Sequence, residues 1–110
     1  MLFDGEFDQS YAAFDLDGLT TDADGYFVIG GSEITNADLT VSENNWLADG
    51  TDAIALYMGN GLTTITTNNL LDALVYGTED DLGLLALLNP DEPQIDEDGV
   101  SDSIGRCKQL

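Results

Sequence analysis

The sequence predicts an all-β fold, a β-sandwich with at most one short helix. One observation behind this is a succession of short β-branched and aromatic segments separated by Asp-Gly and other turn signals. The second is the choice of acid, because 16 of the 22 acidic residues are aspartate, which disfavours helix interiors and suits turns. The length of 110 residues fits one domain, so we expect residues 1–110 to form a single unit with one modest core.

The first half of the chain offers three strand candidates. Residues 11–16 combine tyrosine, alanine and phenylalanine and end at the turn signal Asp17-Gly18. Residues 25–30 are aromatic and β-branched between two glycines. Residues 52–57 alternate small and large apolar side chains after Asp49-Gly50. We expect each of these segments to form a strand.

The second half adds three strands and a helix. Residues 62–67 are rich in threonine, as an exposed strand would be, and residues 70–76 form a strong apolar run that ends at Gly77. The leucine-rich residues 82–88 are expected to form a short helix, stopped by Asn89-Pro90. A last short strand is expected at residues 103–107. The aromatic residues in strand patterns, and the single tryptophan, are expected in the core: Tyr26, Phe27, Trp46, Tyr57 and Tyr76.

The net charge of -20, from 22 acidic and two basic side chains, excludes several classes of function. A chain without histidine has no imidazole base and no histidine ligand for zinc. Arg106 and Lys108 alone offer almost nothing to hold a nucleic-acid backbone, so no nucleic-acid binding is expected. No apolar run is long enough for a membrane helix, and no signal peptide is expected at Met1. We expect no enzymatic activity.

Clustered carboxylates raise the question of calcium, a hard cation that prefers oxygen ligands. Residues 15–25 contain four aspartates around two glycines, but no register of this segment meets the EF-hand pattern. Two Asp-Gly turns are the favoured interpretation, and a calcium site of another geometry is the alternative. The acidic residues 96–98 offer a second, weak possibility. The candidate calcium ligands are Asp15, Asp17, Asp22, Asp24, Asp96 and Asp98.

Four segments in this order resemble the lamin-tail-like domain, in its bacterial secreted branch: residues 24–30, 47–57, 71–77 and 103–106. The resemblance covers most of the chain and implies an immunoglobulin-like β-sandwich without catalytic residues of its own. Members of this branch often lie beside extracellular nuclease or phosphatase modules. This chain departs from the family in its strongly acidic surface, and residues 1–3 resemble the end of a later strand, as if the first strands were missing.

From these observations we expect a non-catalytic binding or scaffold module of an acidic, salt-adapted surface or secreted protein, extracellular or on the cell surface, from a marine or salt-adapted bacterium. A sandwich without its first strands would have an open sheet edge, so we expect self-association through that edge. A protein or polysaccharide partner is also compatible with this interpretation. The alternative is an accessory domain of a secreted nuclease- or phosphatase-type enzyme whose catalytic module lies elsewhere.

Overall fold

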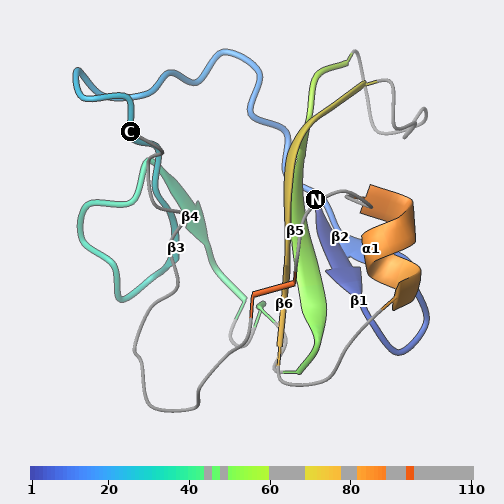
Figure 1. The fold of residues 1–110 in the computed structure, drawn as a ribbon. Helices are drawn as coiled ribbons and strands as arrows, with labels where there is room; N and C mark the ends of the chain where they lie inside the picture. The colour runs from blue at the N-terminus through green and yellow to red at the C-terminus, as the bar shows by residue number, and fades with distance from the viewer. Residues whose placement is uncertain (44–45, 48–49, 60–68, 78–81, 89–93, 96–110) are drawn as a thin grey trace. The chain divides into compact units, whose positions relative to one another are not determined.

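A computed structural model describes residues 1–43, 46–47, 50–59, 69–77, 82–88 and 94–95. Its elements are shown in Figure 1: β1 (Leu2–Asp4), β2 (Gln9–Ala12), β3 (Ile29–Gly31), β4 (Leu39–Val41), β5 (Asp52–Tyr57), β6 (Leu70–Tyr76) and α1 (Leu82–Leu88). The expected all-β fold with one short helix is therefore confirmed. The immunoglobulin-like arrangement of its sheets stays a prediction.

The chain divides into two compact units, which we describe separately. Met1–Ala13 and Asp49–Leu110 form the first, called the sheet unit, and Phe14–Ala48 forms the second, called the inserted unit because it lies between β2 and β5 in the sequence. That residues 1–110 form a single domain stays a prediction.

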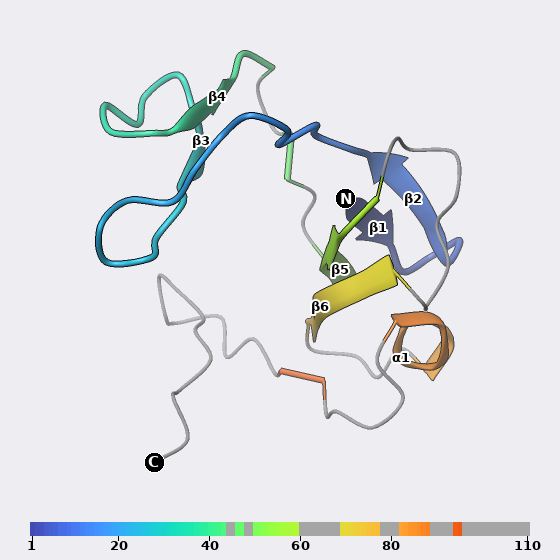
Figure 2. The ribbon, with the colours of Figure 1, turned by 90° about the horizontal axis from the view of Figure 1, so that it is seen from above.

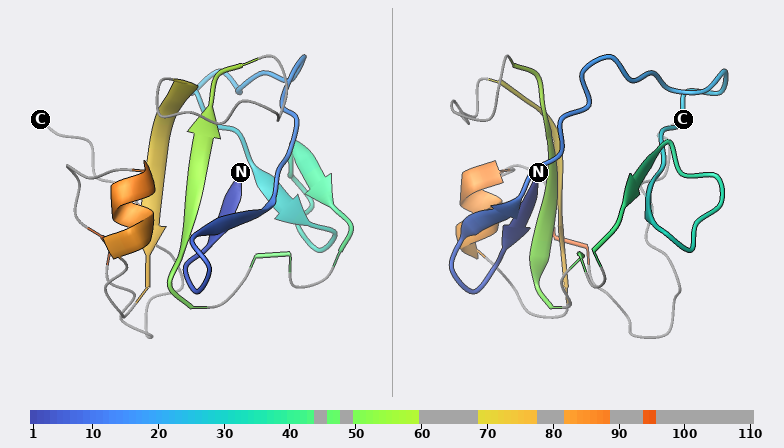
Figure 3. Two further views of the ribbon diagram at one scale, coloured as in Figure 1. Left: turned by 90° about the vertical axis from the view of Figure 1, so that its right-hand side faces the viewer. Right: turned by 180° about the vertical axis from the view of Figure 1, so that it is seen from behind.

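The sheet unit contains a four-stranded sheet in the order β2-β1-β5-β6, in which every neighbouring pair is antiparallel. Figure 3 shows β5 and β6, its two longest strands, side by side. The short β1 lies between β5 and β2. Two hydrogen bonds connect the residue before β1 to β5: the Met1 amino group donates to the Ala55 carbonyl (2.8 Å), and the Ala55 amide donates to the Met1 carbonyl (2.9 Å). Partial burial lowers the pKa of this amino group.

Helix α1 covers one face of this sheet, as the view from above shows (Figure 2). Leu84 and Leu88, four residues apart, point the same way from the helix and are 0% and 3% exposed. They pack on a sheet surface made largely of alanine, whose small side chains allow the helix backbone to approach closely. The buried residues of this core are Phe3, Ala53, Ala55, Ala73, Val75, Leu84 and Leu88.

The inserted unit contains a short parallel pair, β3 and β4, in which Ile29 lies opposite Leu39 and Gly31 opposite Val41. Asp38 joins the two strands at their start, because its carboxylate accepts from the Val28 amide (2.7 Å) while its own amide donates to the Val28 carbonyl (2.8 Å). One side chain thus fixes the register of the pair.

Three expected elements match the structure with the same bounds: the strands at 52–57 and 70–76 and the helix at 82–88. Two other expected strands were largely wrong. Of residues 11–16, only 11 and 12 lie in a strand, because pairing with the short β1 ends at Ala12. Of residues 25–30, only 29 and 30 do, because the Tyr26 amide is still bound by the Asp22 side chain in the loop before β3. The short strand β4 was not expected, and the expected strands at 62–67 and 103–107 lie outside the described residues.

The aromatic residues that were expected in the core differ in how deeply they are buried. Tyr76 is buried (8% exposed), whereas Tyr26 is 69% exposed, so its assignment to the core was wrong. Phe27 and Tyr57 are half-buried, and desolvation raises the pKa of Tyr57. Trp46 is half-buried and meets Phe14 edge to face, with ring centroids 5.8 Å apart.

Replacement of Gly77 by alanine is expected to destabilise the protein strongly. Gly77 follows β6 with φ 130°, and an added Cβ would lie 2.5 Å from Thr51 Oγ1 and 2.6 Å from Thr51 Cα. Gly50→Ala is the matched control, because Gly50 has a similar φ of 122° but nothing within 4 Å of an added Cβ. In urea unfolding, Gly77→Ala should lower the free energy of unfolding by about 2 kcal/mol more than Gly50→Ala. Equal losses would show that only backbone conformation matters at Gly77.

Candidate cation site

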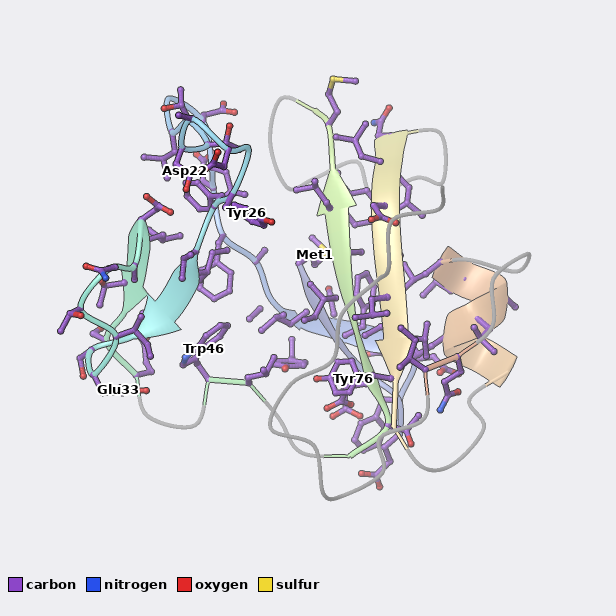
Figure 4. All side chains as sticks on the ribbon, turned by 60° about the vertical axis from the view of Figure 1, so that its left-hand side comes forward. Met1, Asp22, Tyr26, Glu33, Trp46 and Tyr76 are labelled. Carbon is purple, nitrogen blue, oxygen red and sulfur yellow. The ribbon has the colours of Figure 1, made fainter. Side chains whose placement is uncertain are left out.

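Asp22 organises the loop that precedes β3, in the inserted unit. Its Oδ1 atom accepts from the backbone amides of Asp24 and Tyr26, each at 2.9 Å. The Asp22 amide donates to the Tyr26 carbonyl (2.8 Å), and the Gly25 amide donates to the Asp22 carbonyl (3.1 Å). Figure 4 shows Asp22 and Tyr26 on the same loop. The short aspartate side chain therefore closes this turn by bonding to nearby backbone, as is typical of aspartate.

A similar but looser turn precedes it. Asp15 Oδ1 accepts from the Asp17 amide at 2.9 Å, and the Leu19 amide donates to the Leu16 carbonyl at 3.1 Å. Gly18 occupies the third position of this turn with φ 78°, a conformation that favours glycine. Both Asp-Gly pairs of this segment, Asp17-Gly18 and Asp24-Gly25, thus lie in turns.

The four candidate ligands of this segment, Asp15, Asp17, Asp22 and Asp24, are all exposed, and two of them bind backbone amides. Within the described residues, no group of three or more acidic or cysteine side chains is placed to hold a metal ion. The other two candidates, Asp96 and Asp98, lie outside the described residues. A calcium site therefore stays a prediction.

Sequence reasoning overlooked two aspartates that act across longer separations. Asp38 binds the Val28 amide ten residues earlier, and Asp52 accepts from the Gly5 amide at 3.0 Å, 47 residues away in the sequence. Asp52 is only 4% exposed although its side chain is an ionisable carboxyl group. No local pattern identifies such partners, because they are brought together only when the strands pair.

None of the helices in the described part of the chain is long and apolar enough to cross a membrane.

Comparison of the sequence with models of known families and with curated proteins, and of the structure with solved structures, finds no match.

Replacing Asp22 by alanine is expected to lower the free energy of unfolding by about 1 to 2 kcal/mol, because two amides lose their common acceptor. Asp17→Ala is the matched control: it removes the same charge from an exposed site of the same segment and should change stability by less than about 0.5 kcal/mol. Urea unfolding of both variants at one ionic strength makes the comparison. Equal effects would contradict a structural role for Asp22.

Cations are expected to raise the melting temperature, because the folded chain concentrates a net charge of -20. Sodium chloride should raise it by screening, since the Debye length falls from about 30 Å at 0.01 M to about 3 Å at 1 M. Specific calcium binding would add a further increase through mass action. Thermal melts in sodium chloride and calcium chloride at matched ionic strength separate the two. A gain from calcium no larger than that from sodium would leave screening alone.

Proposed function

We propose that this protein is a non-catalytic binding or scaffold module of an acidic, salt-adapted protein that is secreted or carried on the cell surface, and that copies associate by adding strands to its sheet. The observation that carries the proposal is the character of β2 (Gln9–Ala12), the last strand of the four-stranded sheet, which bears no charge. The absence of histidine from the sequence, and the use of several aspartates as acceptors for backbone amides, support a non-catalytic role.

On the opposite edge of the sheet, the C-terminal end of β6 is already engaged. The Ile95 amide donates to the Val75 carbonyl (2.9 Å), and the Gly77 amide donates to the Ile95 carbonyl (3.2 Å). The Gln94 side-chain amide adds a bond to the Gly77 carbonyl (3.1 Å). This end of β6 is thereby covered by a second segment of the same chain, so association through β2 is the favoured geometry.

The composition of β2 supports its role as a pairing edge. Edge strands are commonly guarded against pairing by charged side chains, by proline or by bulges. β1, β5 and β6 each contain one aspartate, at Asp4, Asp52 and Asp72, whereas β2 contains neither a charge nor a proline. The one protective feature of β2 is an irregularity in its pairing with β1. Leu2 lies opposite Ala12, whereas Phe3 lies opposite Ser10, so the register shifts between them. In a chain with 22 acidic residues, an edge strand without charge is favourable for pairing with a second copy.

The proposal includes two features that rest on the sequence: membership of the lamin-tail-like family and an immunoglobulin-like arrangement of the sheets. The strands at Asp52–Tyr57 and Leu70–Tyr76 support it, because both coincide with segments that carry the resemblance. Any screening cation can take the place of calcium in this scheme, since the role of the cation is to reduce repulsion between acidic copies.

A lysine on the edge strand is expected to weaken association although it lowers the net negative charge, because pairing of two copies of β2 would bring the two added charges together. Ser10→Lys places on β2 a lysine of the kind that protects edge strands against pairing. Ser32→Lys is the control, because it makes the same change of charge at an exposed residue in the inserted unit. Sedimentation velocity at micromolar protein and high salt should show dimers or larger species for the unmodified chain and for Ser32→Lys. Ser10→Lys should shift the association constant about tenfold toward the monomer, the equivalent of about 1.4 kcal/mol.

Two results would contradict the proposal. A stable monomer at micromolar concentration in high salt would show that the β2 edge does not pair. Equal association of the two lysine variants would place the contact elsewhere on the surface. Circular dichroism of both variants serves as the control that each one is folded.

A further inference from the structure

Asp-Gly pairs are chemically labile, because glycine has no side chain to keep its backbone nitrogen away from the preceding carboxyl group. The sequence contains five of them, and the structure describes both residues of three: Asp4-Gly5, Asp17-Gly18 and Asp24-Gly25. We propose that Asp17 is a site of spontaneous conversion to isoaspartate in the folded protein, whereas the folded structure protects Asp4 and Asp24.

The reacting groups at Asp17-Gly18 are accessible. Both residues are exposed, and nothing lies within 4 Å of the position that a Cβ of Gly18 would occupy. The hydrogen bonds of this turn use the amides of Asp17 and Leu19. Within the residues that the structure describes, neither the Gly18 amide nor the Asp17 carboxylate takes part in a hydrogen bond. Within this described part of the chain, neither group therefore has to break a bond before it reacts.

The other two pairs differ in the state of the glycine nitrogen. The Gly5 amide donates to Asp52 Oδ1 (3.0 Å), and Asp4 Oδ1 is itself bound by the Glu6 amide (2.7 Å). The Gly25 amide donates to the Asp22 carbonyl at 3.1 Å. The nitrogen that must attack is held by an acceptor in both cases, and reaction requires that this bond first opens.

The reaction is balanced without a co-reactant other than water. The Gly18 backbone nitrogen attacks Asp17 Cγ of the protonated carboxyl group, the nitrogen loses its proton and a carboxyl oxygen leaves as water, giving a cyclic imide. Water then opens the ring at one of its two carbonyl carbons. Opening at the former backbone carbonyl leaves the chain running through Cγ, which is isoaspartate, and opening at Cγ restores aspartate.

Conversion at Asp17 would alter the turn that contains it. Isoaspartate adds a methylene group to the backbone between Asp17 and Gly18, so the spacing that brings the Leu19 amide to the Leu16 carbonyl at 3.1 Å is lost. The Asp22 loop lies later in the chain and has its own bonds, so its closure does not depend on this turn. The change is expected to be local to residues 15–19.

The test compares the three pairs within one molecule. The full chain is incubated at neutral pH and 37 °C, folded or in concentrated urea, and isoaspartate is assigned to each position by proteolysis and electron-transfer fragmentation. In the folded chain, Asp17 should convert about tenfold faster than Asp24 or Asp4, as expected for the loss of about one hydrogen bond before reaction. In urea the three rates should agree within about a factor of two, because no folded bond distinguishes them.

Two variants complete the experiment. Asp17→Glu should abolish the modification at residue 17, since the longer side chain closes a larger ring slowly, and Asp24→Glu is the matched control that should leave conversion at Asp17 unchanged. Conversion of Asp24 as fast as Asp17 in the folded chain would overturn the proposal. So would a rate at Asp17 that rises about tenfold or more in urea, because the folded turn would then be protective as well.

Discussion

Hydrogen bonds that backbone amides donate to aspartate carboxylates fix the connections on which the rest of this structure depends. Asp38 sets the register of the parallel pair, Asp22 closes the loop before it, and Asp52 ties the turn after β1 to the start of β5. Bonds of this kind are stronger than those between neutral groups because the acceptor is charged. The abundance of aspartate over glutamate follows from this use, since the shorter side chain reaches the neighbouring backbone more readily.

The use of aspartate carboxylates as acceptors for backbone amides has an electrostatic cost. The same side chains contribute to the net charge of -20, so the folded chain keeps many acidic groups close together. With only two basic residues in the sequence, salt and cations have to provide most of the compensation. The aspartates that fix local structure are therefore also a source of the overall repulsion, and this is the reasoning behind the proposed salt-adapted setting.

How far the sequence predicts the structure depends on the range of the interactions. The bounds of β5, β6 and α1 were predicted because apolar runs and the stop signals Gly77 and Asn89-Pro90 are local. Tyr26 was misplaced because its amide closes the Asp22 loop, so the residue precedes β3 instead of lying in a strand, and its side chain is 69% exposed. Of the candidate site, the turns were predictable from Asp-Gly pairs. The bond from Gly5 to Asp52 was not, since it spans 47 residues.

The small core of the sheet unit gives a reason why association of copies would stabilise the fold. The sheet surface beneath α1 is built largely from Ala53, Ala55 and Ala73, which bury little apolar area each. Among the side chains that the structure describes in the seven-residue helix, Leu84 and Leu88 are the buried ones. Small cores of this kind leave a narrow margin of stability, which electrostatic repulsion reduces further. Strand addition at β2 would bury more surface without enlarging the chain, so the proposed assembly would also stabilise each copy, provided that salt screens the charges between them.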